Sequence, residues 1–189
     1  MSLNIVVQIS LSNSGIRVQG KEVLTDSGSD QFLNSAYKSL RIKYPKFFKM
    51  DDLSKLGFIA SELLLGTEEA KNLIDKTEKN KIGIVLQNSD SSVDVDRKHL
   101  KSIADKENYY PSPALFVYTL PNIVMGEISI RNNFKGENAL FIFEKYNAEF
   151  NELYINSLFR QNKLEACIGG WFNANNGIYQ AEFYLAAKE

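Results

Sequence analysis

The chain has 189 residues, 44% of them hydrophobic and 24% charged, and its 22 basic and 23 acidic residues give a net charge of −1. This length and composition predict one globular domain, residues 1–189, around a single core. The balanced charge lacks the basic excess of nucleic-acid-binding proteins, so we expect no nucleic-acid partner. No apolar run reaches the roughly 18 residues of a membrane-spanning helix and no signal-peptide pattern opens the chain, so we expect no membrane association and a cytoplasmic location.

The N-terminal part begins with a strand pattern and is then harder to assign. Residues 4–11 are the β-branched run NIVVQISL, followed by turn-forming residues, which predicts a first strand. Residues 20–30 contain two glycines and several small polar residues without a clear period, so we expect a loop or an irregular hairpin. Apolar residues near helical spacing predict a helical segment over residues 30–40.

The most definite helix pattern follows residue 50. Asp51 and Asp52 can cap free amides at a helix start, and residues 53–65 are apolar on nearly all sides. A helix that is apolar all round is buried, so we expect this one at the centre of the fold. Thr67, followed by two glutamates, predicts the cap of a further short helix.

A buried strand and a proline-bounded passage come next. Residues 81–89 are the near-continuous apolar run KIGIVLQNS, which is typical of a strand covered on both faces of a parallel sheet, and a helix is expected over residues 93–104. The acids in DSSVDVD lack the glycine and glutamate of a calcium loop, so we interpret them as a capping cluster and predict no metal site. Pro111 and Pro113 predict an extended passage.

A helix, a strand and a second helix follow this passage. Pro121 suits a first helical turn and predicts a helix over residues 121–133, in which Gly126 implies that a neighbouring backbone packs closely. Residues 137–144, ENALFIFE, predict a strand, and Asn147 is a plausible cap of the next helix. That helix has apolar residues at helical spacing, namely Phe150, Leu153, Tyr154 and Leu158.

The C-terminal part predicts a hairpin. Residues 165–174, EACIGGWFNA, form a buried strand pattern with two glycines, and residues 177–186, GIYQAEFYLA, alternate as a strand joined to it by a turn. Strands that alternate with helices and end in a hairpin predict an α/β fold. We expect a mixed five-stranded sheet, mostly parallel with the last strand antiparallel, and helices on both faces.

Neither the single cysteine nor the single histidine lies in a catalytic motif. Cys167 lies in the apolar run EACIGGWF, so we expect a buried, inert thiol. His99 has no thiol, zinc-ligand pattern or acid in a recognisable motif, and we interpret it as a solvated helix residue. The sequence contains no G-x-S-x-G turn, phosphate-binding loop or dinucleotide fingerprint, and we predict no cofactor.

Residues 111–144 resemble a segment of a known family. The stretch PSPALFVYTLPNIVMGEISIRNNFKGENALFIFE is similar to the approach to the catalytic cysteine in 3-oxoacyl-[acyl-carrier-protein] synthases, the condensing enzymes of the thiolase superfamily. A weaker likeness extends over almost the whole chain, through FFKMDDLSKLGFIASELLL, KIGIVLQNS and the strand with two glycines. The resemblance implies a single thiolase-like half domain, similar to the N-terminal half of such a synthase.

The chain departs from this family at the nucleophile. Gly136 matches a family glycine, but Glu137 follows where the family commonly has proline, and the nucleophile position falls near Glu144 and Lys145. The family's assisting histidines, or histidine and asparagine, come from its second half, which this chain does not resemble. Because a carboxylate or ammonium cannot carry the acyl group as a thiolate does, we predict no catalytic residue and interpret Glu144 and Lys145 as a solvated pair.

The resemblance also implies a dimer. An apolar strand such as ALFIF is an aggregation risk at an open sheet edge, and in the family it pairs with its twin across a two-fold axis. We therefore predict an interface with a second copy or with a complete ketosynthase, and a second candidate contact on the helix over residues 53–65. The interface residues are Asn138, Ala139, Leu140, Phe141, Ile142 and Phe143.

The expected function follows from the lost nucleophile. We predict a catalytically inactive, ketosynthase-like partner subunit in acyl-carrier-dependent fatty-acid or polyketide-type synthesis, with acyl carrier protein as a further candidate partner. A divergent acyl-thioester enzyme with an unidentified nucleophile and a purely structural dimer are the alternatives. Aromatic residues on paired strands are more often core than pocket lining. The candidates for an acyl pocket are Phe116, Tyr118, Trp171 and Phe172.

Overall fold

The computed structural model describes residues 2–25, 32–107 and 109–189. Its strands are β1 (Asn4–Ser12), β2 (Gly15–Val18), β3 (Lys21–Thr25), β4 (Ile82–Asn88), β5 (Asn138–Ile142), β6 (Ala166–Asn175) and β7 (Ile178–Ala187). Its helices are α1 (Phe32–Ser39), α2 (Asp52–Leu65), α3 (Glu68–Lys76), α4 (Val93–Ile103), α5 (Pro113–Val117), α6 (Ile123–Asn132) and α7 (Ala148–Arg160). Two short 3-10 turns, η1 (Pro45–Lys49) and η2 (Lys79–Lys81), complete the described elements.

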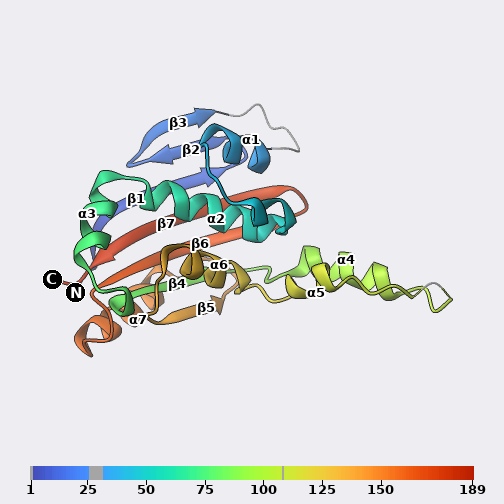
Figure 1. The fold of residues 1–189 in the computed structure, drawn as a ribbon. Helices are drawn as coiled ribbons and strands as arrows, with labels where there is room; N and C mark the ends of the chain where they lie inside the picture. The colour runs from blue at the N-terminus through green and yellow to red at the C-terminus, as the bar shows by residue number, and fades with distance from the viewer. Residues whose placement is uncertain (1, 26–31, 108) are drawn as a thin grey trace.

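The strands form one mixed sheet with helices on both faces (Figure 1). The strand order is β3-β2-β1-β7-β6-β4-β5. β4 pairs in parallel with β5 and β6, and the other neighbours are antiparallel. The predicted α/β class is confirmed, but the prediction of five mostly parallel strands is wrong, because the sheet has seven strands and most of its pairings are antiparallel.

The additional strands come from the N-terminal part of the chain. β1 turns directly into β2, and β2 pairs with β3 as a hairpin whose register shifts between Ile16 and Arg17. The irregular hairpin expected over residues 20–30 is therefore present as far as residue 25, and residues 26–31 lie outside the described residues. β1 also pairs along most of its length with β7, which joins the two ends of the chain in one sheet.

α2 is the central helix of one face. Asp51 begins it by accepting the N–H of Ser54 at 3.1 Å, as its sequence predicts. Gly57 lets the helix approach β6 and α6, because a Cβ there would lie 3.1 Å from Val124 and 3.3 Å from the ring of Phe172. α1 and α6 contribute to the same core, so α2 is covered and its predicted role as a second partner contact is wrong.

α7 covers part of the opposite face. Its buried residues Ile155, Leu158 and Phe159 pack against β4 and β6 around Val85 and Cys167. On this same face, beside α7, every second residue of β1 and β7 points away from the main core. Most of these residues are polar, and they are exposed or half-buried. No helix among the described residues is long and apolar enough to cross a membrane.

The segment after β4 leaves the body of the molecule. Residues 89–107 and 109–120, here called the arm, carry α4 and α5 and project beyond the end of the sheet (Figure 1). Ser112 caps α5 by accepting the N–H of Leu115 at 3.3 Å, so part of the passage predicted as extended is a short helix. α6 then begins at Ile123, and the expected close backbone contact at Gly126 is wrong, since a Cβ there would meet no atom within 4 Å.

Candidate partner-binding edge

β5 forms one end of the sheet. Its one strand neighbour among the described residues is β4, with which it pairs from Ile84↔Asn138 to Asn88↔Ile142. The residues of β5 are half-buried or exposed, whereas every residue of β4 is buried. The strand predicted to mediate dimerisation thus lies at an open edge, and the interface itself stays a prediction.

Half of the backbone polar groups of β5 point to this open side. The carbonyl of Glu137 accepts the N–H of Ile84 at 2.9 Å, and the N–H of Phe143 donates to the carbonyl of Asn88 at 3.0 Å. Because successive residues of a strand direct these groups to opposite sides, alternate residues between them face away from β4. Their N–H and C=O groups are the ones that a further strand would pair with. These residues are Asn138, Leu140 and Ile142.

An aromatic cluster flanks this edge on the α7 side. Phe141 packs edge-on against Phe150 and Tyr154 with ring centroids 4.7 and 5.0 Å apart, and Phe143 lies 5.1 Å from Phe150. All four rings, here called the aromatic ledge, are half-buried, and neighbouring Leu153 is 58% exposed. Helical spacing predicts that these α7 residues share a face, but only the fold shows that this face borders β5.

The opposite end of the sheet has a different character. β3 contributes five residues there, and it exposes Lys21 and Glu22. Charged side chains on a short edge strand oppose the addition of another strand. β5 has the uncharged sequence NALFI, so it is the edge that favours strand pairing.

Glu144 and Lys145, which the sequence resemblance places near the family's nucleophile position, lie in the loop after β5, and both are exposed. Gln87 anchors this loop from behind, because its amide donates to the carbonyl of Asn147 at 2.9 Å and accepts the N–H of Asn147 at 2.8 Å. Asn147 also caps α7 by accepting the N–H of Phe150 at 3.0 Å, as predicted. Hydrogen bonds at Asn147 therefore fix the loop, but the side chains that it exposes are those of a glutamate and a lysine and not of a cysteine.

Two tyrosines lie at this loop, Tyr146 within it and Tyr184 on β7. Asn151, which is fully buried on α7, donates from Nδ2 to the hydroxyl of Tyr184 at 3.0 Å. Burial raises the pKa of Tyr184 and of Tyr146, so both phenols stay protonated at neutral pH. They act as hydrogen-bonding groups in the structure and not as nucleophiles.

Cys167 lies near the other end of the sheet. It pairs in register with Gly83 at the start of β4, whereas the loop follows the end of β5, where Ile142 pairs with Asn88 at the end of β4. Five strand residues correspond to about 16 Å. The predicted burial of Cys167 is confirmed, and burial raises the pKa of its thiol.

The four side chains predicted to line an acyl pocket are dispersed. Trp171 and Phe172 are neighbours in β6 and therefore face opposite sides of the sheet, Trp171 towards Tyr146 and Phe172 into the core around α2. Tyr118 packs at the margin of that core, and Phe116 is 62% exposed on the arm. The structure does not bring these four side chains together around one cavity.

His99 is less solvated than its sequence predicts. Its ring lies 5.7 Å from that of Phe116, and its Nδ1 is buried without a hydrogen bond to the described residues. His99 lies on a helix as expected and is half-buried, because Phe116 of α5 covers one side of its ring. Within the described residues, no group of three His, Cys, Asp or Glu side chains could hold a metal ion.

Comparison with known proteins identifies the fold. No protein-family model matches the sequence, and no curated protein matches it. The structure superposes on the ishigamide ketosynthase/chain length factor with a TM-score of 0.71 and 15% identity, over 99% of this chain and 62% of that chain. This chain has a ketosynthase-like fold. It spans 62% of the length of that first structural relative.

Two further structures agree with this assignment. The ketosynthase ApeO in complex with its chain length factor ApeC, from Xenorhabdus doucetiae, matches with a TM-score of 0.67 and 10% identity over 100% of this chain and 80% of that chain. AntDE:AntF (apo), a type II PKS acyl-carrier protein in complex with its ketosynthase bound to the hexaketide, matches with a TM-score of 0.64 and 13% identity over 99% and 62%. Structural similarity at identities this low shows the fold alone, so the function has to be argued from the residues.

Proposed function

We propose that this chain is a catalytically inactive, ketosynthase-like subunit that pairs with a ketosynthase in acyl-carrier-dependent fatty-acid or polyketide-type synthesis. The observation that carries the proposal is a contrast within residues 138–145. The strand is an apolar open edge, whereas the loop after it carries Glu144 and Lys145 in place of a thiol. A solved structure of this fold is a ketosynthase in complex with its chain length factor, which supports a partner of that kind.

The chemistry of the loop supports inactivity. Condensation of acyl thioesters requires a thiolate that accepts the acyl group and donors that stabilise the oxyanion. Glu144 carries a carboxylate and Lys145 an amine, and neither can hold the acyl group as the thioester that condensation requires. Cys167 is buried and about 16 Å along the sheet from the end of β4, so it cannot replace the missing thiol.

The edge of β5 offers a partner both backbone hydrogen-bonding groups and apolar surface. The free N–H and C=O groups of β5 fix the register of an added strand, and the aromatic ledge beside them would be covered by it. Four rings that each expose at most about a third of their area amount to at most roughly 300 Å². A stable interface needs about 800 Å² on each partner. The ledge therefore accounts for at most about a third of an interface, and further contacts must supply the rest.

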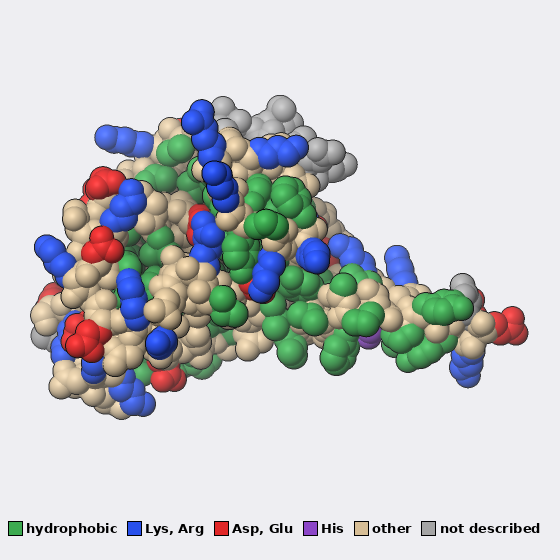
Figure 2. All heavy atoms as spheres, in the orientation of Figure 1, with side chains coloured by type: hydrophobic (Ala, Val, Ile, Leu, Met, Phe, Trp, Pro, Cys, Tyr) green, Lys and Arg blue, Asp and Glu red, His purple; other side chains and the backbone are tan. Residues whose placement is uncertain are grey.

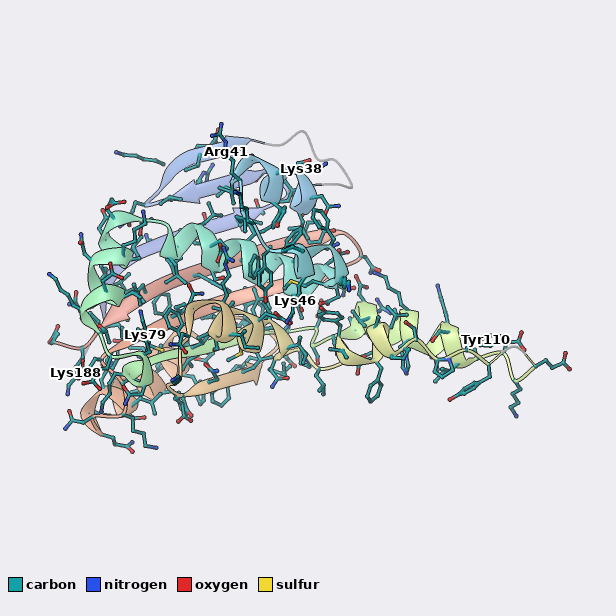
Figure 3. All side chains as sticks on the ribbon, in the orientation of Figure 1. Lys38, Arg41, Lys46, Lys79, Tyr110 and Lys188 are labelled. Atoms are coloured by element: carbon teal, nitrogen blue, oxygen red, sulfur yellow. The ribbon has the colours of Figure 1, made fainter. Side chains whose placement is uncertain are left out.

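The second partner that we propose is the acyl carrier protein. Residues 38–49 contain five cations and no acid, and all five are exposed. Figure 3 labels three of them, Lys38, Arg41 and Lys46, on the side of α1 and η1. Such a segment attracts a carrier with an acidic surface, and the attraction weakens with salt. A solved structure of this fold includes a carrier protein in complex with its ketosynthase, which supports this partner.

A reconstitution tests the proposal. The chain is mixed with a complete ketosynthase from the same genome and with an acyl-carrier thioester, and the mass of each subunit is measured. We expect a complex with the ketosynthase, acylation of the ketosynthase alone, and product formation that requires both subunits. Stable acylation of this chain at Lys145 or Cys167 would instead support a divergent enzyme, and self-association without ketosynthase binding would support a structural dimer.

A further inference from the structure

The arm exposes a cluster of large apolar side chains. We call this cluster the arm patch, and its residues with their exposed fractions are Leu100 (63%), Tyr109 (57%), Tyr110 (78%), Phe116 (62%) and Leu120 (57%). Single exposed apolar residues are common on soluble proteins, but a group of them on one projection is a mark of an interaction site. The sequence did not predict the arm patch, because Pro111 and Pro113 favour an extended passage. The structure instead has the short helix α5 there, and this helix exposes Phe116.

The arm buries very little of itself. Val95 is the only buried residue of α4, and α5 has none. Helices of this length are marginal in water unless packing stabilises them. The arm therefore lacks the internal core that would explain its apolar side chains, which indicates that another surface covers them.

The base of the arm is nevertheless firmly attached to the sheet. Asp90 accepts hydrogen bonds from Nδ2 of Asn173 at 2.9 Å and Nδ2 of Asn175 at 2.8 Å, both on β6. These hydrogen bonds hold the pKa of Asp90 below its usual value, so the carboxylate is charged at neutral pH. The hydroxyl of Ser92 donates to the carbonyl of Thr119 at 2.7 Å and closes the base of the arm. A partner therefore meets an arm whose direction is already fixed.

The arm patch and the open edge of β5 face the same side of the molecule. In Figure 1, β5 is the lower edge of the sheet and the arm continues beyond the end of β4. In Figure 2, hydrophobic side chains line the lower margin of the arm. Tyr110 lies towards the far end of the arm, well beyond the sheet (Figure 3). A body that adds a strand to β5 therefore also lies below the arm.

We propose that the arm patch packs against the ketosynthase subunit that pairs with β5, so that one partner covers both surfaces. This inference rests on the proposed function and adds a second contact to it. Five large side chains exposed by about 60% contribute several hundred Å² of apolar surface. This is about the area that a stable interface needs in addition to the aromatic ledge. The matching surface on the partner is apolar and lies beyond the end of its pairing strand.

Binding and cross-linking test the arm in the complex reconstituted with that ketosynthase. The dissociation constant is measured for the double variant Tyr110→Ser/Phe116→Ser and for Tyr110→Ser alone, which alters only a largely exposed side chain. Ile178→Ser is the matched control, since Ile178 is 72% exposed but lies at the turn between β6 and β7. A photoreactive phenylalanine analogue at position 110 reports which chain lies beside the arm.

We expect the double variant to bind at least about 30-fold more weakly, because central aromatic contacts dominate interface energies. Tyr110→Ser should lose about tenfold, the control should change little, and the analogue should cross-link to the ketosynthase. Unchanged affinity of the arm variants, or a cross-link to a second copy or to the carrier protein, would overturn the inference while ketosynthase binding still supports the proposed function. If wild type binds no ketosynthase at all, the proposed function fails together with the inference.

Discussion

Substitution of the two glycines of β6 should destabilise the fold for different reasons. A Cβ on Gly169 would lie 2.5 Å from Cε2 of the Tyr184 ring, whereas a Cβ on Gly170 would meet the backbone carbonyl of Glu182. Overpacking of this kind costs about 1–3 kcal/mol, and displacement of Tyr184 from Asn151 costs about 1 kcal/mol more. Alanine regains up to about 1 kcal/mol by restricting the unfolded chain. We therefore expect Gly169→Ala to lower the free energy of unfolding by about 2 kcal/mol.

Urea unfolding of a double-mutant cycle isolates the ring contact. In a Tyr184→Ala background the obstructing ring is absent, so Gly169→Ala should cost almost nothing there, whereas in Tyr184→Phe the ring remains and the cost should persist. Gly170→Ala is the control, because its φ of 142° and its backbone neighbour make it costly in every background. An equal cost of Gly169→Ala with and without the ring would refute this account of the glycine pair.

Three further predictions concern other contacts. Asp90→Asn should lower the free energy of unfolding by about 1–2 kcal/mol at neutral pH. Because the folded pKa of Asp90 is depressed, this difference should begin to shrink below about pH 4, the unfolded pKa, and vanish once the pH has fallen through the lower folded pKa. A difference that does not shrink in acid would be inconsistent. Arg131→Ala should cost about 1 kcal/mol in urea unfolding, since Arg131 pairs with both oxygens of Glu62 at 2.6 and 2.7 Å, and no loss would contradict this. Cys167 should react with a thiol reagent only at the rate of unfolding, because burial raises its pKa, and rapid labelling would disprove that.

Helix boundaries were predictable where a cap fixes them. Asp51, Thr67 and Asn147 each accept the backbone amide that the sequence assigns to them. Sheet order was not predictable in the same way, because β1 pairs with a strand more than 160 residues later, as in Ile9↔Phe183. Local patterns indicate that a strand exists, but the choice of its neighbour depends on packing between distant segments.

The candidate edge was only partly accessible from the sequence. The apolar run of β5 predicts an edge that needs a partner, and the structure places this strand at the end of the sheet. The aromatic ledge depends on how α7 crosses β5, which helical spacing of Phe150 and Tyr154 does not determine. The arm patch requires the direction of the arm, which is set by Asp90 and two asparagines on β6.

Backbone pairing at the open edge is the central claim, and Ile142 offers the most direct test of it. Its side chain is 49% exposed, and its N–H points away from β4. Proline removes this N–H without breaking a bond to β4, whereas alanine keeps it and removes a similar amount of side chain. The measurement is the Kd of each variant for the ketosynthase subunit, with melting temperatures as the control for folding.

The account predicts that Ile142→Pro binds at least about tenfold more weakly than Ile142→Ala, with both variants folded. Equal affinities for the two variants would contradict strand pairing at β5.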